Sequence, residues 1–195
     1  MGVPCQHCGR EYDVTLFEFG RTIWCTCGSR VGLRPRARRI GPRAEKRFIA
    51  DAMLGRLARW LRLLGFDCAH DTRILDPDLV RRGVAEERII LSRDRALPQE
   101  WWVSEIYLVQ AEGVRSQLVE VLRRFGLAAE IRPLCRCAEC NQRLRPADAV
   151  ADRVPERIRT THDAFSECPG CGRVYWEGTH AAQIRRFVDE LLAAA

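Results

Sequence analysis

Three aspartates between Phe48 and Asp94 are spaced so that a parallel α/β sheet would bring them together. The stretch reads as strand, helix, strand, helix, strand. Asp51 ends the first strand, Asp78 begins the second helix and Asp94 ends the third strand. The carboxyl ends of parallel strands share one edge of a sheet, and ligands bind there. Converging carboxylates at this edge predict a site for a hard cation such as Mg²⁺ or Mn²⁺.

Each acid also has an ordinary structural interpretation. Asp51 and Asp78 suit helix N-caps, and Asp94 suits the opening of a turn. Their joint position at strand ends favours the metal site. Two arginines flank the third acid, and two more follow the first on the next helix, so all four are candidates to bind a substrate phosphate. These arginines are Arg93, Arg95, Arg56 and Arg59.

The elements that must position the acids can be read from hydrophobic periodicity. Leucines at a spacing of three to four residues mark the buried face of the first helix, namely Leu54, Leu57, Leu61 and Leu64. Gly65 and Gly126 are the expected C-caps of two helices. The alternation of strands and helices predicts a parallel sheet. The strands are expected at 48–50, 66–69, 88–91 and 106–109, and the helices at 53–64, 78–85 and 114–125.

Eight of the ten cysteines fall into four close pairs, which predict two zinc sites. Four thiolates saturate a tetrahedral Zn²⁺ ion, so both sites would be structural. The first site lies in a ribbon over 1–33, where 12–19 and 22–24 are expected to pair as a hairpin around Gly20. The second lies in 131–195, which ends in a helix that His180 begins. The zinc ligands are Cys5, Cys8, Cys25 and Cys27, then Cys137, Cys140, Cys168 and Cys171.

The two remaining cysteines have simpler interpretations. Cys68 is expected to be a small buried residue of a strand. Cys135 precedes a CxxC knuckle and ranks below Cys137 as a ligand. A tryptophan on the first helix, Trp60, is assigned to the core. Trp101 and Trp102 lie in a loop-like stretch and suit either hydrophobic burial or stacking on nucleic-acid bases.

Composition favours a globular, basic protein of the cytoplasm. The chain has 195 residues, is 47% hydrophobic and carries a net charge of +6. No apolar run reaches the about 18 residues of a membrane span, and the N-terminus has no apolar signal region. Arginine supplies nearly all the positive charge, which suits phosphate binding or a genome rich in GC. Residues 34–47 hold seven basic residues and one acid, which indicates a solvated linker or an arm on a phosphate backbone.

The chain contains the motifs D-x-M-L-G-R-L-A-R-W-L-R-L-L-G-F-D, then D-x-x-L-V, then R-I-I-L-S-R-D-R-x-L, then R-C-x-x-C-N and C-P-x-C-G-R-V-Y-W-x-G-T-H. Together they resemble the motifs of the Mut-seven C-terminal RNase family, a compact branch of the PIN-like nucleases. The resemblance covers about 48–180 and implies a PIN-like α/β core of three layers fused to a zinc ribbon. It implies metal-dependent cleavage of RNA, with Asp51, Asp78 and Asp94 as the motif acids. His180 falls within the last motif and could touch substrate or cap structure.

PIN-like nucleases usually carry a fourth acid, for which Asp71, Asp76 and Glu87 are candidates. The predicted fold is thus a PIN-like core at 48–130 flanked by two β-rich zinc ribbons, with a basic linker at 34–47. The predicted function is a Mg²⁺- or Mn²⁺-dependent ribonuclease that grips RNA with the linker and the ribbons. The alternative is a zinc protein that binds RNA, a ribosome or tRNA without cutting. A DNA-binding regulator is a weaker third hypothesis.

Overall fold

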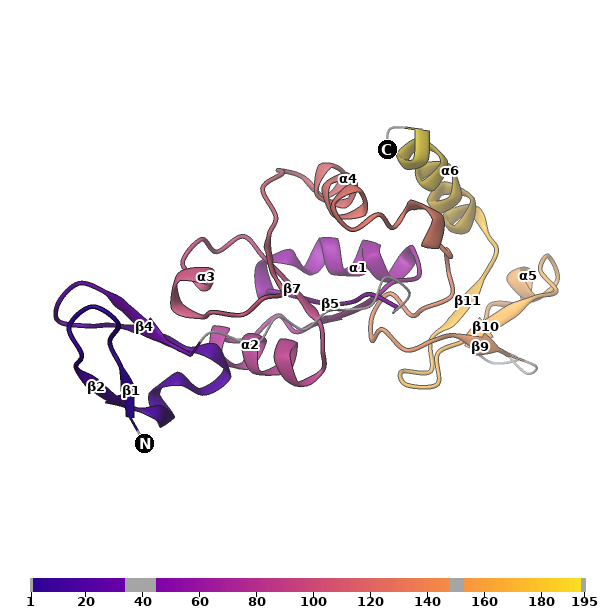
Figure 1. Ribbon diagram of the computed structural model, residues 1–195. Helices are drawn as coiled ribbons and strands as arrows, with labels where there is room; N and C mark the ends of the chain where they lie inside the picture. Colours follow the sequence, from indigo (N-terminus) through magenta and orange to yellow (C-terminus); the bar gives the residue numbers. More distant parts are fainter. Residues whose placement is uncertain (1, 34–44, 148–152, 194–195) are drawn as a thin grey trace. The chain divides into compact units, whose positions relative to one another are not determined.

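A computed structural model describes residues 2–33, 45–147 and 153–193 of the chain (Figure 1). Its described residues fall into two compact units. The first is drawn from Met1–Gly55 and His70–Val109, and the second from Arg56–Ala69 and Gln110–Ala195. The predicted domain boundaries stay a prediction, and most of the basic linker, 34–44, lies outside the described residues. No helix among the described ranges is long and apolar enough to cross a membrane.

The first unit contains a zinc-ribbon candidate and most of a parallel sheet. The ribbon elements are β1 (Gly2–Pro4), β2 (Glu11–Asp13), the 3-10 segment η1 (Val14–Gly20), β3 (Thr22–Trp24) and β4 (Arg30–Gly32). The others are β5 (Arg47–Ala50), η2 (Ala52–Leu54), α2 (Asp76–Ala85), β7 (Ile89–Ser92), α3 (Leu97–Glu100) and β8 (Ile106–Leu108).

The sheet has the order β6-β5-β7-β8, with β6 at Asp67–His70. Strands β5 and β7 are parallel, with Ile49 opposite Ile90, and β7 is parallel to β8. All four residues of β7 are buried, as expected for a sheet covered on both faces. Helix α2 packs on β5 and β7, and Gly83 allows it to come close, because a Cβ there would meet Ile90 Cγ1 at 2.5 Å. The parallel pairing of β5 with β7 places the carboxyl ends of these two strands side by side.

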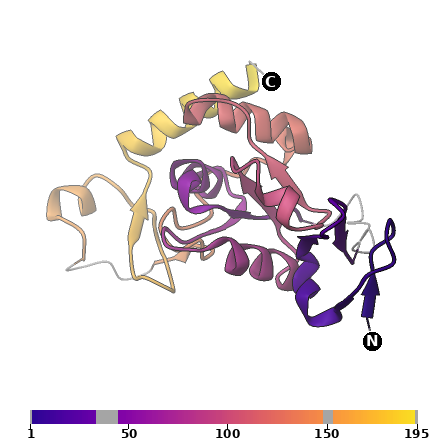
Figure 2. The same cartoon turned by 90° about the vertical axis from the view of Figure 1, so that its left-hand side faces the viewer.

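The second unit contains α1, the helices that follow it in the chain from α4 onward, and the C-terminal ribbon. Its elements are α1 (Gly55–Leu63), α4 (Val114–Phe125), η3 (Ala128–Glu130), β9 (Arg145–Pro146), α5 (Glu156–Arg159), β10 (Phe165–Glu167), β11 (Val174–Trp176) and α6 (Thr179–Ala193). The ribbon strands form an antiparallel sheet of order β11-β10-β9. Helices α4 and α6 lie side by side in both ribbon views, and Arg115 pairs with Glu190 between them at 2.9 Å (Figures 1 and 2).

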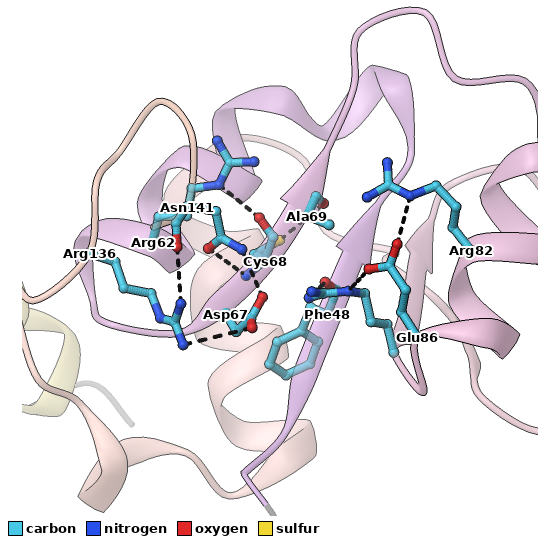
Figure 3. A network of polar contacts seen from close by, with 10 residues as sticks. Phe48, Arg62, Asp67, Cys68, Ala69, Arg82, Glu86, Arg136 and Asn141 are labelled. Atoms are coloured by element: carbon cyan, nitrogen blue, oxygen red, sulfur yellow. Dashed lines mark hydrogen bonds and ion pairs between the residues drawn. The ribbon is translucent and has the colours of Figure 1, made fainter. Parts of the chain in front are cut away.

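A buried arginine connects α1 to the C-terminal ribbon within the second unit. Arg62 is only 6% exposed, and its guanidinium donates to the carbonyls of Cys68, Ala138 and Glu139 at 2.7, 3.2 and 2.6 Å. Figure 3 shows Arg62 beside a second bridge, in which the Asn141 amide donates to Asp67 at 2.7 Å. The buried charge of Arg62 is tolerated because backbone carbonyls accept its hydrogen bonds in place of water.

A separate ion-pair chain in Figure 3 belongs to the first unit. Glu86 accepts from Arg82 at 3.0 Å and from Arg88 at 2.6 Å, and Arg88 also donates to the carbonyl of Phe48. The pKa of Glu86 is lowered: burial alone would raise it, but the hydrogen bonds and charges of both arginines outweigh that effect. This chain ties the C-terminal end of α2 to the start of β5.

The α/β class, the parallel sheet and the two four-cysteine groups confirm the predicted fold class. The predicted hairpin between 12–19 and 22–24 is wrong. Strand β2 pairs with β1, and β3 pairs with β4, so each cysteine knuckle turns its own hairpin. The intervening segment coils because Asp13 Oδ1 accepts from both the amide and the hydroxyl of Thr15 and starts a 3-10 turn. That turn buries Phe17 in the small ribbon core.

Candidate active site and metal centres

Asp51 lies at the carboxyl end of β5, where the chain turns into η2. It is the N-cap residue of η2 and only 6% exposed. Its amide donates to the carbonyl of Leu91 at 2.9 Å, which continues the pairing of β5 with β7. Its Oδ2 accepts a hydrogen bond of 2.5 Å from the hydroxyl of Ser92. Strand pairing and this hydroxyl therefore fix the carboxylate at the sheet edge.

Asp94 lies two residues beyond β7, at the same edge. Its amide donates to Ser92 Oγ at 2.9 Å, and its Oδ1 accepts from the amide of Ala96 at 2.8 Å. The Ser92 side chain is thus hydrogen-bonded to both site acids. The structure brings Asp51 and Asp94 together through one buried serine, as the strand pattern predicted for the two strand ends.

Asp76 is the third acid that shares this environment. It is the first residue of α2, with Pro77 in the first turn, where proline is favoured. Burial raises the pKa of its carboxyl, and the negative charges of Asp51, Asp94 and Glu100 raise it further. Like charges raise a carboxyl pKa when they are close enough to oppose its ionisation. Asp76 and Glu100 therefore belong to the same acidic region as the two strand-end aspartates.

The remaining acidic candidates have local partners. Asp78 is exposed and pairs with Arg81, one turn along α2, at 3.1 Å. Asp71 is exposed and accepts from the amide of Arg73 in a turn. Glu87 is exposed, with a positive φ of 55°, just after α2. The metal role of Asp78 stays a prediction, and the charges of the other acids act on the pKa of its neighbour Asp76.

The oxygens of the site carboxylates lie farther apart than they would if all of them bound one metal ion directly. Among the described residues, three or more ligand atoms come within 4.8 Å of one another only in the two cysteine groups. A cation between the acids would thus keep some of its water ligands. Mg²⁺ characteristically does so, since it dehydrates reluctantly and often binds through one or two carboxylates. The donor set therefore fits Mg²⁺ or Mn²⁺ and does not resemble a closed structural site.

The predicted substrate-binding residues are spread over both units. Arg93 and Arg95 are exposed on either side of Asp94 in the first unit. Arg56 and Arg59 lie on α1 in the second unit, where Arg59 pairs with Glu139 at 2.5 Å. His180 is in α6, but its side chain lies outside what the structure describes. The substrate roles of these residues stay predictions.

The first cysteine group has the spacing that zinc requires. Cys5 and Cys27 Sγ atoms are 3.7 Å apart, and those of Cys8 and Cys25 are 3.5 Å apart. Thiolates about 2.3 Å from a tetrahedral Zn²⁺ ion would stand about 3.8 Å from one another. Hydrogen bonding from the backbone of Cys27 and from Tyr12 lowers the pKa of Cys25 to about 5. These hydrogen bonds favour the thiolate form of Cys25, which is the form that binds metal.

The second cysteine group is built in the same way. Cys137 and Cys171 Sγ atoms are 3.6 Å apart, and those of Cys140 and Cys168 are 3.2 Å apart. Burial raises the pKa of Cys137, but the Tyr175 hydroxyl, 3.0 Å away, and nearby backbone amides lower it to about 6. All eight predicted ligands therefore form two groups, each of which could hold zinc. Cys135 is exposed and outside both groups, and Cys68 is buried in β6, as expected.

Two functional candidates escaped the sequence analysis. Ser92 looks like the polar end of a strand, and only the pairing of β5 with β7 shows that it faces Asp51. His70 ends β6, and its Nε2 lies 3.2 Å from the carbonyl of Ala52 in the turn after Asp51. A Cβ at Gly55 would meet the His70 ring at 3.0 Å. No sequence spacing identifies these contacts, because they depend on the packed turn.

Comparison with known protein families gives one match. The family model described as "Mut7-C RNAse domain" matches residues 46–188, which include the acidic region and the second cysteine group. The first cysteine group lies outside the matched residues. No curated protein and no solved structure shows a significant match.

Proposed function

Because the chain belongs to the Mut7-C RNAse domain family, we propose that it is a ribonuclease that hydrolyses internal RNA phosphodiester bonds with Mg²⁺ or Mn²⁺. One observation carries this proposal. Hydrogen bonds to the Ser92 hydroxyl connect Asp51 and Asp94 at the carboxyl ends of β5 and β7. Asp76 supplies the third carboxylate in our proposal, ahead of Asp78, since it shares the field of the other two acids.

The protein's own groups have distinct tasks in this proposal. Asp51 and Asp94 hold the cation, and Asp76 contributes charge and a further oxygen. A bound Mg²⁺ or Mn²⁺ ion would supply Lewis acidity and an activated water for attack on phosphorus. Ser92 keeps the Asp51 carboxylate in one orientation through its hydroxyl proton. In this proposal Arg93 and Arg95, which are exposed on either side of Asp94, contact the non-bridging oxygens of a phosphate.

The cysteine groups have a structural task in this proposal. Each holds one Zn²⁺ ion with four thiolates, which leaves no coordination position for substrate. The thiolates require a reducing compartment, so we place the protein in the cytoplasm. The ribbons and the basic linker 34–47 hold RNA through its phosphates, with binding that weakens as salt increases.

A cleavage assay tests the proposal. Protein containing two zinc ions per chain is incubated with total cellular RNA and Mn²⁺, Mg²⁺ or EDTA. Wild type is compared with Asp51→Asn, Asp94→Asn and the control Asp163→Asn, which changes an exposed acid of the second unit. We expect cleavage that needs added metal, is lost in the first two variants and persists in the control. Equal activity in all four proteins would refute the site assignment.

One observation favours the non-catalytic alternative. The carboxylates do not form a compact ligand group, as an RNA-binding protein without chemistry would allow. Such a protein, with RNA, a ribosome or tRNA as its partner, would bind RNA with a steep dependence on salt. It would leave every RNA intact in Mn²⁺ and Mg²⁺. The same assay, read together with a binding measurement, separates the two functions.

A further inference from the structure

Helix α3 follows the site acid Asp94 and is too short to satisfy its own carbonyls. It spans only Leu97–Glu100, and the last carbonyls of any helix lack partners within the helix. Inside it, the carbonyl of Leu97 accepts from the amide of Trp101 at 3.0 Å. The carbonyls of Pro98, Gln99 and Glu100 come after it, and each one accepts a hydrogen bond from the N-terminal ribbon.

Two ribbon side chains supply these donors. The Thr22 hydroxyl lies 2.9 Å from the carbonyl of Gln99 and 3.0 Å from that of Glu100, and shares its proton between them. Arg30 Nη2 donates to the carbonyl of Pro98 at 2.9 Å, while its Nε donates to Thr22 Oγ1 at 2.8 Å. Thr22 is 9% exposed, so water competes little for these bonds. The ribbon thus caps the carbonyl end of α3.

The backbones of the ribbon and of the segment after α3 are also closely fitted. The amide of Trp102 donates to the carbonyl of Gly20 at 2.7 Å, and Arg21 forms an isolated antiparallel bridge with Trp101. Gly20 has a φ of +82°, and a Cβ there would lie 2.7 Å from the carbonyl oxygen of Trp102. The Arg30 guanidinium lies 5.0 Å from the centre of the Trp102 ring. Side chains and main chain together hold this contact in one register.

The N-terminal end of α3 is hydrogen-bonded to the acidic site through Ala96. Asp94 Oδ1 accepts from the amide of Ala96, and the carbonyl of Ala96 accepts from the amides of Gln99 and Glu100. A continuous series of hydrogen bonds therefore runs from the ribbon through α3 to the Asp94 carboxylate. All of its members belong to the first unit.

We infer that Thr22 and Arg30 are positioning residues for the acidic metal site, acting through α3 on Asp94. The ribbon lies outside the residues that match the RNase domain family, so it is an added element that steadies the site from beside it. The inference rests on the proposed function for the identity of the site. It concerns the order of the segment 94–102 and the affinity of the site for its cation.

The test uses the full chain with both zinc ions bound and compares Thr22→Val with Thr22→Ser. Thr15→Val is the matched control, since Thr15 is an exposed threonine of the same ribbon whose hydroxyl donates to Asp13, two residues away. Mn²⁺ binding is measured by electron paramagnetic resonance, and amide hydrogen exchange is measured for 94–102. Neither readout requires cleavage, so a failure of the nuclease proposal does not hide the result. Zinc content and melting temperature verify that each variant is folded.

We expect Thr22→Val to weaken Mn²⁺ binding by about 3- to 10-fold, the effect of losing one or two hydrogen bonds that order a ligand segment. Exchange should accelerate at Ala96 and at 99–102 but not in β5. Thr22→Ser should restore both values, and Thr15→Val should match wild type. Unchanged Mn²⁺ affinity and exchange in Thr22→Val would overturn the inference, as would an equal change in Thr15→Val or a wild-type protein that binds no Mn²⁺.

Discussion

The hydroxyl of Ser92 donates a 2.5 Å hydrogen bond to Oδ2 of Asp51, across the paired strands β7 and β5. The hydroxyl oxygen of Ser92, in turn, accepts a hydrogen bond from the amide of Asp94. Ser92 is fully buried, so its loss would leave the Asp51 carboxylate and the Asp94 amide without this partner. One side chain thus sets the relative placement of two proposed metal ligands.

Ser92→Ala should therefore weaken both stability and metal binding. Removing one partner of a buried polar group costs about 1–3 kcal/mol, because the other group loses water without compensation. We expect a lower midpoint in urea unfolding and a cleavage rate reduced about tenfold, with a higher Mn²⁺ requirement. Ser92→Thr keeps the hydroxyl and serves as the control. A full Mn²⁺ response in Ser92→Ala would contradict the role given to this residue.

Asp76→Asn and Asp78→Asn should differ in their effect on pH dependence. Burial and the neighbouring acids raise the pKa of Asp76 above its unfolded value. In the absence of divalent metal, ionisation of Asp76 therefore lowers the free energy of unfolding as pH rises through its folded pKa. Asp76→Asn should raise the melting temperature of metal-free protein at neutral pH and reduce its stabilisation by Mn²⁺.

The matched variant is Asp78→Asn, which alters an exposed ion pair with Arg81. Exposed pairs contribute about 0–1 kcal/mol, so little change in melting temperature is expected. Thermal scans from pH 4 to pH 8, with and without Mn²⁺, compare the two variants. If Asp78→Asn alone removed the Mn²⁺ effect, Asp78 would replace Asp76 as the third ligand.

Arg62→Met should destabilise the second unit. Arg62 is buried and donates to three backbone carbonyls, whose loss of partners we expect to cost about 3 kcal/mol in unfolding free energy. Arg59→Met, on an exposed turn of the same helix, should cost less than about 1 kcal/mol. Urea unfolding monitored by tryptophan fluorescence measures both. Equal costs for the two substitutions would be inconsistent with a structural role for Arg62.

Tyr175→Phe should weaken zinc binding at the second cysteine group alone. The Tyr175 hydroxyl bonds to the Cys137 sulfur at 3.0 Å, and loss of such an outer partner typically lowers metal affinity by about 10- to 100-fold. Tyr12→Phe is the reciprocal variant, since Tyr12 bonds to Cys25 in the first group. Zinc release to a chromogenic chelator should show two phases, one for each cysteine group. In each variant, one of these phases should be faster than in wild type. Acceleration of both phases by a single substitution would contradict two independent sites.

The sequence predicted what depends on local spacing or on hydrophobic period. The leucine stripe predicted over 53–64 is buried at Leu54, Leu57, Leu61 and Leu64, and all eight paired cysteines fall into two groups. Four of the strands and three of the helices lie within a few residues of their predicted positions. These features follow from the period of the chain itself.

Other features depended on contacts that the sequence does not display. Helix α2 begins at Asp76, two residues before the predicted start at Asp78, and both the exposure of Asp78 and the influence of the other acids on Asp76 depend on the folded sheet edge. The alternating residues of 14–19 resembled a strand, yet the Asp13 side chain diverted them into a 3-10 turn. Ser92 gained its position only from the pairing of β5 with β7.

The separation of contacts along the chain also bears on the order of folding. Cys5 and Cys27 are 22 residues apart, Asp51 and Ser92 are 41 apart, and Thr22 and Gln99 are 77 apart. Contacts between nearby residues form faster, because closing a short loop costs less entropy. During synthesis the N-terminal ribbon should thus close around its metal before the sheet exists. Helix α3 would then form against the ribbon that had folded before it, and zinc supply would govern how quickly the proposed site forms.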